Sequence, residues 1–306
     1  MGEEHFSKQH FCLDREIQKT LAENSKALII NIVLSSIFSI TATLGNLLVL
    51  VSKWRSSNLN SPSMILVCGL AVSDLCVGFI SEPMFIGFYV SLFLKGKAVP
   101  CLFVSIKVTV TVHLTDANLL TITAITIDRY LAIYFHLRYE EVVTQTRAKV
   151  VIACLWIISG LHLLAWIRGF EALAAVMAAL LSVCLVTVSF IWIKIYQVVR
   201  HHQAQIQDQF HAQAQQQFNM LRFRKSVVNN FMILLVFLVC YVPYLVSSIN
   251  LAREFNGSNL LTHVFLYSFI LLKSSLNPLL YCCRQSDIRA ATKQTLRQLF
   301  CLTQGQ

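Results

Sequence analysis

Seven long apolar segments constrain this chain more than any other feature of its sequence. Short polar stretches separate them, and they span roughly 27–52, 61–91, 98–131, 148–168, 172–199, 226–252 and 260–283. About 20 apolar residues are enough to cross the hydrocarbon core of a bilayer as a helix. A lone strand would leave its backbone polar groups unsatisfied in lipid, so each segment is expected to be helical. The expected fold class is therefore all-α, a bundle of seven transmembrane helices.

The composition agrees with a membrane protein. Of the 306 residues, 56% are hydrophobic and 13% are charged, whereas a soluble domain carries about 25% charged residues. The net charge of +10 does not indicate a nucleic-acid partner, because Lys and Arg cluster at the ends of the apolar segments and form no patch alternating with aromatic residues. We attribute this charge to topology and to contact with membrane lipids.

The distribution of basic residues predicts the orientation. The stretches after the first, third, fifth and seventh segments carry more Lys and Arg than the stretches on the other side, so the N-terminus is expected outside the cell membrane and the C-terminus in the cytoplasm. Residues 1–26 are polar, which predicts an extracellular tail rather than a secretory signal peptide. Residues 27–283 form the seven-helix domain, and 284–306 an amphipathic helix with a cytoplasmic tail.

Two modifications are expected from this topology. Asn256 begins a glycosylation sequon on the outer side. Ile288, Ala291, Leu296 and Phe300 can share one face of a helix lying on the inner leaflet. Cys301 beside them, and also Cys282 or Cys283, are candidates for lipidation.

Short motifs recur at corresponding places in the segments. Asp128-Arg129-Tyr130 ends the third segment, and the others are Gly45-Asn46, 70-LAVSDL-75, Trp156, Tyr196, Pro243 and 277-NPLLY-281. Together, over about residues 27–300, they resemble the rhodopsin-like (class A) G-protein-coupled receptors. The resemblance implies a non-enzymatic receptor that passes the signal of an extracellular ligand to a heterotrimeric G protein, without a cofactor.

The resemblance also implies an activation switch. Asp128 restrains the permanently charged fork of Arg129, which moves into the core when such receptors are active. Pro243 removes a backbone hydrogen bond and kinks the sixth helix, and Asn277 and Pro278 loosen the seventh. Tyr196 and Tyr281 are expected to share a water-mediated contact in the active state. Tyr130 completes the motif.

Lys273 is the most unusual residue of the seventh segment. A charged side chain at the bilayer centre costs about 2.5–3.5 kcal/mol on insertion scales. Asp74, in the second segment, is the carboxylate that holds a sodium ion in many relatives, and its matching polar neighbours here include Asn118, Lys273, Ser274 and Asn277; Asn46 belongs to the same buried pocket. We expect the Lys273 ammonium to occupy the sodium position and to neutralise Asp74. The alternative is that Lys273 faces another helix.

The ligand pocket is inferred from position. Its expected residues, in the outer halves of the helices, are Glu82, Lys107, Thr111, Thr115, Tyr241, Tyr244, Ser248, His263 and Tyr267. Thr111 stands where amine receptors carry an aspartate, so a peptide, nucleoside or lipid-like ligand is expected rather than a monoamine. Glu82 and Lys107 are the strongest candidates for contacts, because charges within a membrane are functional by default.

The second extracellular loop departs most from the family. It is very short and contains no cysteine, so Cys101 is expected to pair with Cys12 instead. The short loop resembles that of the melanocortin receptors, within the branch that also holds adenosine, cannabinoid and lysophospholipid receptors. The calcium-binding acidic cluster of melanocortin receptors is not visible in the sequence.

Two other classes remain open at this stage. A transporter or channel could use buried Asp74, Asp116 and Lys273 as an ion path, although no internal repeat is visible. A membrane enzyme could use His113 and Asp116, but no further residues complete a metal site, so none is expected.

The basic start of the sixth segment, Arg224 and Lys225, cannot pair with Arg129, which predicts basal signalling.

Overall fold

The structure, a computed structural model, describes most of the chain. The described residues are 15–55, 61–95, 99–135, 138–167, 170–208, 235–236, 238–251, 253–254, 256–284 and 286–303. No strand occurs among them, so the expected all-α class is confirmed. Arg224 and Lys225 lie outside these residues, and the expectation of basal signalling stays a prediction.

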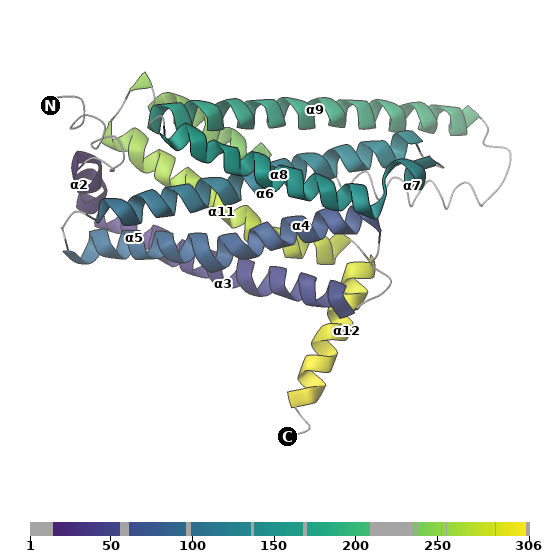
Figure 1. Cartoon of the computed structure of the whole chain (residues 1–306), viewed down its shortest axis with the longest axis horizontal. Coiled ribbons are helices and arrows are strands. Elements are labelled where there is room, and N and C mark those ends of the chain that lie inside the picture. The colour runs from purple at the N-terminus through teal and green to yellow at the C-terminus, as the bar shows by residue number, and fades with distance from the viewer. Residues whose placement is uncertain are drawn as a thin grey trace.

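Long helices run side by side along one axis (Figure 1). They are α3 (Ser25–Arg55), α4 (Pro62–Cys76), α5 (Glu82–Lys95), α6 (Cys101–Phe135), α8 (Gln145–Ile167), α9 (Phe170–Asp208) and α11 (Gly257–Arg284). The π-helical turn η1 (Val77–Ser81) joins α4 to α5, which makes them one span. Helical residues Leu238–Leu251 belong to the expected sixth segment. Because α9 continues to Asp208, the fifth helix extends beyond its predicted end at residue 199.

Several described helices are long and apolar enough to cross a membrane. They are Ser25–Arg55, Pro62–Leu94, Cys101–Phe135, Ala175–Val198 and Gly257–Cys282, and Leu238–Leu251 is a shorter apolar helix. Large apolar side chains such as Leu44, Phe79 and Val186 point outward and are more than 60% exposed. An outer surface of this kind fits lipid rather than water.

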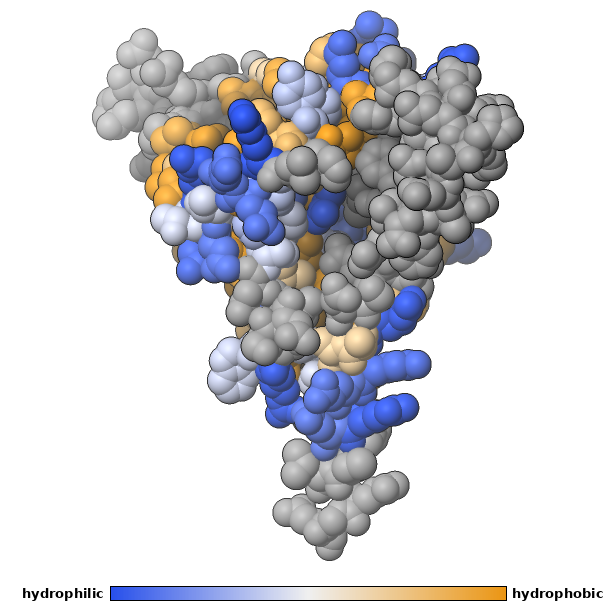
Figure 2. Space-filling view, turned by 90° about the vertical axis from the view of Figure 1, so that its right-hand side faces the viewer, coloured by the Kyte–Doolittle hydropathy of each residue, from blue (hydrophilic) through white to orange (hydrophobic). Residues whose placement is uncertain are grey.

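The two ends of the bundle differ from its flanks. We name them the Cys101 end, where α6 begins, and the Arg129 end, where it finishes. Figure 2 views the molecule from the right-hand side of Figure 1, onto the Arg129 end, and hydrophilic residues gather there and along the helix that projects below. The contrast between the apolar flanks and this polar end is that of a membrane-spanning bundle.

Helix α6 is the centre of the bundle. In its most apolar window 72% of the residues are buried, against 22% for α3. One apolar cluster, around Leu70, Leu119 and Ile122, fills the half toward the Arg129 end, and another, around Phe88 and Leu114, fills the half toward the Cys101 end. Polar residues of α6 must therefore find partners inside the bundle.

The π-helical turn η1 is held by close contact with α3. A Cβ atom on Gly78 would lie 2.8 Å from the Thr43 backbone nitrogen and 2.8 Å from the Ala42 Cβ. Ser39 Oγ donates a hydrogen bond of 2.7 Å to the Gly78 carbonyl. Ser81, the last residue of the turn, and Glu82, the first residue of α5, are fully buried. Single π turns within α-helices occur frequently at functional sites.

Two shorter helices close the ends. At the Cys101 end, α2 (Arg15–Glu23) docks through buried Leu21, and Gln18 Oε1 accepts a 2.7 Å hydrogen bond from the Val99 backbone N–H. The sequence indicated only a polar tail here. At the Arg129 end, α12 (Ser286–Thr303) turns away from the bundle axis (Figure 1). Its buried face includes Ile288 and Ala291 as expected. The face continues through Thr292 and Thr295, whereas Leu296, which was expected on it, is only half-buried.

Candidate functional site

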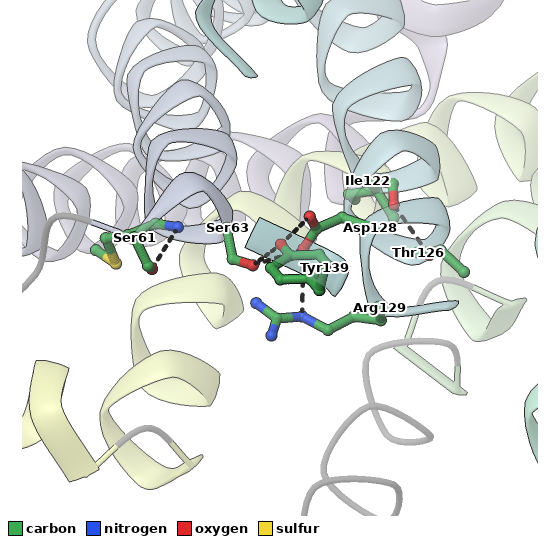
Figure 3. A network of polar contacts seen from close by, with 8 residues as sticks. Ser61, Ser63, Ile122, Thr126, Asp128, Arg129 and Tyr139 are labelled. Carbon is green, nitrogen blue, oxygen red and sulfur yellow. Dashed lines mark hydrogen bonds and ion pairs between the residues drawn. The ribbon is translucent and has the colours of Figure 1, made fainter. Parts of the chain in front are cut away.

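Asp128 is enclosed by hydroxyl donors at the Arg129 end (Figure 3). Ser63, in the first turn of α4, donates to Asp128 Oδ2 at 2.7 Å, and Tyr139 donates to Oδ1 at 2.6 Å. Arg129 Nε lies 3.9 Å from Asp128 Oδ2. The Asp128 side chain is 4% exposed and that of Arg129 is 27% exposed. The carboxylate is therefore satisfied by other groups, while the guanidinium stays accessible from outside the bundle.

Tyr139 is positioned by the one-turn helix α7 (Tyr139–Val142). Its hydroxyl also lies 2.9 Å from Ser63 Oγ, so the three side chains form a closed set. Partial burial, followed by the hydrogen bond to the Asp128 carboxylate, raises the pKa of Tyr139 to about 12. Tyr139 therefore remains a donor at every physiological pH. The sequence analysis missed Ser63 and Tyr139, whose only signal was their place at helix ends.

The remaining switch residues lie apart from this set. Tyr130 packs against the apolar cluster of Val188, Trp192 and Ile195. Tyr196 faces outward and is 62% exposed, whereas the Tyr281 side chain is buried. The structure does not bring these two tyrosines together, and their expected contact in an active state stays a prediction. Pro243 is exposed on the sixth segment.

A buried polar network crosses the middle of the bundle. Asn118 of α6 donates to Asp74 Oδ1, and Asn277 of α11 donates to Asp74 Oδ2 at 2.6 Å. The Lys273 ammonium donates to the Asn118 side-chain oxygen. These side chains are each at most 3% exposed. In the part of the chain that the structure describes, Lys273 forms no direct ion pair with Asp74, so the two charges are connected through the Asn118 amide.

Asn46 joins α3 to the same region. Its amide donates to the Ser274 carbonyl at 3.0 Å and to the Ala42 carbonyl at 2.9 Å. Pro278 has no N–H to offer the Ser274 carbonyl, so Asn46 satisfies a backbone group that the proline leaves free. This requires close packing, because a Cβ atom on Gly45 would lie 2.9 Å from Pro278 Cγ. Asn46 Oδ1 and the Tyr281 hydroxyl are buried without a hydrogen-bond partner among the described residues.

Lys107 and Glu82 occupy the half toward the Cys101 end. The Lys107 ammonium lies 4.2 Å from the ring centroid of Phe85 and 4.0 Å from that of Phe88. Its side chain is buried, and the described residues provide it with no carboxylate. Glu82 is fully buried, and neither of its carboxylate oxygens has a hydrogen-bond partner within the described ranges. The structure therefore does not pair Lys107 with Glu82. The phenylalanines beside Lys107 were missed by the sequence analysis.

Aromatic rings adjoin these charged groups. Tyr267 lies 5.4 Å from Phe85 and 5.5 Å from Tyr244, and Tyr244 lies 4.8 Å from His263, measured between ring centroids. The Thr115 and Tyr267 hydroxyls are 3.4 Å apart. The structure thus brings together four members of the predicted ligand pocket, which are Thr115, Tyr244, His263 and Tyr267.

The other members of the predicted pocket form hydrogen bonds with nearby groups of the protein. Thr111 Oγ1 lies 2.8 Å from Ser81 Oγ, and Ser248 donates to the Tyr244 carbonyl. Tyr241 is buried deeper, with its hydroxyl 3.5 Å from Lys273 Nζ. Tyr241 therefore belongs to the central network, and its place in a ligand pocket stays a prediction.

The predicted modification sites are only partly visible. Cys101 is disulfide-bonded, but Cys12 lies outside the described residues, so the pairing stays a prediction. Asn256 Oδ1 accepts a 2.8 Å hydrogen bond from the Asn259 N–H at the start of α11. This capping contact leaves the side-chain nitrogen, to which a glycan attaches, uncommitted. Cys301 lies near the end of α12. No cluster of metal-ligating residues occurs among the described residues.

Comparisons with known proteins point to one family. Residues 45–171 match the 7 transmembrane receptor (rhodopsin family) model. Adenosine receptor A2a of Equus caballus is 40% identical over 121 residues, which cover 40% of this chain and 28% of that receptor. Melanocortin receptor 5 of Mus musculus is 24% identical over 297 residues, 90% of this chain and 86% of the relative, and melanocortin receptor 4 of Danio rerio is 25% identical over 87% and 82%.

The helical bundle, its apolar flanks and its buried polar network define a multi-pass membrane protein. The match with the adenosine A2a receptor spans only 28% of that receptor's length. Together with the nearly full-length melanocortin matches, the similarity over residues 45–171 supports a receptor of the rhodopsin family, near the melanocortin and adenosine branch. The transporter alternative is not favoured by these relatives.

Proposed function

We propose that this chain is a G-protein-coupled receptor, with the Cys101 end extracellular and the Arg129 end in the cytoplasm. The observation that carries the proposal is the enclosure of Asp128. Ser63 and Tyr139 satisfy the carboxylate, so Arg129 is held by one long contact and can leave it at little cost. A permanently charged, accessible guanidinium is suited to backbone carbonyls of a partner protein. Heterotrimeric G proteins are the partners this end would meet, and membrane lipids surround the apolar flanks.

The ligand would bind in the half toward the Cys101 end. The relatives are named adenosine and melanocortin receptors, which supports a nucleoside or peptide ligand here. Lys107 holds a buried ammonium against two phenylalanine rings and lacks a described acidic partner. A ligand with an acidic group could supply that partner, and its planar or apolar part could pack against Tyr244 and Tyr267. The ligand proposed is therefore an anionic nucleoside-like or peptide molecule.

The coupling is tested by measuring cyclic AMP in cells that express the chain and the Arg129→Ala variant at matched surface levels. We expect the wild type to differ from mock-transfected cells without added ligand, and the variant to lose that difference. Lys149→Ala is the matched control, because Lys149 is an exposed cation at the same end that contacts no switch residue. It should behave as the wild type does.

The opposite results would count against the proposal. A cyclic AMP difference that persists in Arg129→Ala would show that the signal does not depend on Arg129. An ion current that appears with the wild type and disappears with Asp74→Asn, without any second-messenger change, would favour a transporter instead.

A further inference from the structure

The Lys273 ammonium is an internal cation shared by several helices. It extends from the middle of α11, is 2% exposed and donates to the Asn118 side-chain oxygen on α6. It also lies 3.5 Å from the Tyr241 hydroxyl and 5.4 Å from the centroid of the Tyr241 ring, on the sixth segment. One positive charge carried by α11 therefore contacts groups from two other spans.

The Asn118 amide lies between two opposite charges, and its orientation matches both of them. An ammonium has only donors, so it must face the amide oxygen, and an ionised carboxylate has only acceptors, so it must face the amide nitrogen. Asn118 meets both requirements, with its oxygen toward Lys273 and its nitrogen toward Asp74. Asn277 provides a second amide nitrogen to Asp74. The Asn118 amide thus connects the Asp74 carboxylate with the Lys273 ammonium.

The oxygens around this ammonium would suit a free cation if Lys273 were absent. They are the Asn118 side-chain oxygen, which accepts from the ammonium, and the Asp74 carboxylate on the other side of that amide. Carboxylate and amide oxygens are the ligands of hard cations. A carboxylate left buried without a positive charge would draw such an ion in.

We propose that Lys273 is a built-in cation that fills this interhelical site, so that the protein binds no sodium ion at Asp74 and its conformational equilibrium is independent of sodium. A free ion can leave when helices rearrange, whereas a tethered ammonium remains and can only change partners. Its position beside Tyr241 makes that residue the next partner within reach. The inference deepens the proposed receptor function, but its test needs neither a ligand nor a G protein.

The first test is the thermal unfolding of purified full-length protein in detergent, in sodium chloride and in choline chloride at equal ionic strength. We expect the wild-type Tm to be the same in both salts. Lys273→Asn, which removes the ammonium and adds an oxygen ligand, should have a Tm higher by a few degrees in sodium, because an ion that binds only the folded state stabilises it. Lys26→Asn, at an exposed position of α3, is the control.

Two results would overturn the proposal. One is a wild-type Tm that rises in sodium as much as that of Lys273→Asn. The other is a folded Lys273→Asn variant whose Tm does not respond to sodium.

A charge cycle covers the case in which Lys273→Asn does not fold. Asp74→Asn and Lys273→Met each leave one uncompensated buried charge, and the double variant leaves none. In choline chloride we expect the double variant to have a higher Tm and greater surface expression than either single variant. Additive losses would show that the two charges are not balanced against each other and would reject the built-in cation.

Discussion

The Asp128 carboxylate accepts its hydrogen bonds from two hydroxyl groups rather than from its neighbour Arg129. Hydroxyls from the start of α4 and from α7 satisfy it, although they are distant in sequence from each other. A buried carboxylate with two hydroxyl donors does not depend on one salt bridge, and a contact of 3.9 Å between partly exposed groups contributes little. At the scale of single residues, the state of Arg129 is therefore controlled by how firmly Tyr139 and Ser63 hold Asp128.

Tyr139→Phe tests this control. Removing the hydroxyl leaves Asp128 with one donor fewer, which should lower the free energy of unfolding by about 1–2 kcal/mol and change basal signalling. Tyr134→Phe is the control, because Tyr134 is 63% exposed and stacks on Tyr130 through its ring alone. Thermal unfolding and basal cyclic AMP at matched expression measure both effects. Equal behaviour of the two variants would show that the Tyr139 hydroxyl is dispensable.

The pH dependence of this contact follows from the raised pKa of Tyr139. Because the folded state favours the protonated phenol, the stabilisation is fully present below the ordinary tyrosine pKa of about 10. It is lost only as the pH rises toward about 12. The difference in Tm between the wild type and Tyr139→Phe should therefore be constant from pH 6 to pH 9. A difference that shrinks within this interval would mean that another group titrates at the site.

At the scale of elements, helix packing depends on places where backbones approach closely. The turn η1 fits against α3 only because Gly78 has no side chain, and the extra residue in a π turn changes which face of the following helix is buried. Ser81 at the end of the turn and Glu82 directly after it are buried, while Phe79 and Ile80 within the turn are exposed. The turn therefore decides which residues of the second span face the inside of the bundle.

Gly78→Ala and Gly87→Ala form a matched pair within this span. A Cβ atom at Gly78 would lie 2.8 Å from backbone of α3, which cannot move easily, whereas at Gly87 the nearest atom is Phe103 Cζ at 3.6 Å, an ordinary contact. We expect Gly78→Ala to lose about 1–3 kcal/mol of stability and much of its surface expression, and Gly87→Ala to be near neutral. Thermal unfolding and surface labelling provide the measurements. Similar losses in both would mean that helix propensity, rather than close packing, governs the span.

The sequence predicted the spans and the central network better than the details around them. Apolar length was enough to place the helices, and the resemblance to rhodopsin-like receptors was enough to group Asp74 with Asn118, Lys273 and Asn277. It did not show that Asn118 stands between the charges, because only side-chain geometry decides that. The phenylalanines beside Lys107 were missed for a related reason. Their inward direction depends on the backbone beyond η1, which apolar periodicity does not reveal.

At the scale of the whole molecule, buried charges lie at three depths along the bundle. Lys107 and Glu82 lie toward the Cys101 end, Asp74 and Lys273 lie in the middle, and Asp128 with Arg129 lies at the other end. Tyr241, on the sixth segment, contacts Lys273. Tyr244, three residues further along the same segment, lies against Tyr267 nearer the Cys101 end. A ligand that moves the sixth segment would therefore act on the central charges before it affects Arg129.

Lys107→Gln tests the outer member of this series. If an acidic agonist provides the partner that Lys107 lacks, losing the ammonium should raise its EC50 about tenfold or more, since a hydrogen bond between charged groups is worth about 1.5–3 kcal/mol. Lys26→Gln, an exposed cation near the start of α3, is the matched control. Basal cyclic AMP should be unchanged in both, because Lys107 is remote from Arg129. An acidic agonist whose potency is the same on Lys107→Gln and on the wild type would show that its charge binds elsewhere, and Lys107 would then be a structural cation held by Phe85 and Phe88 alone.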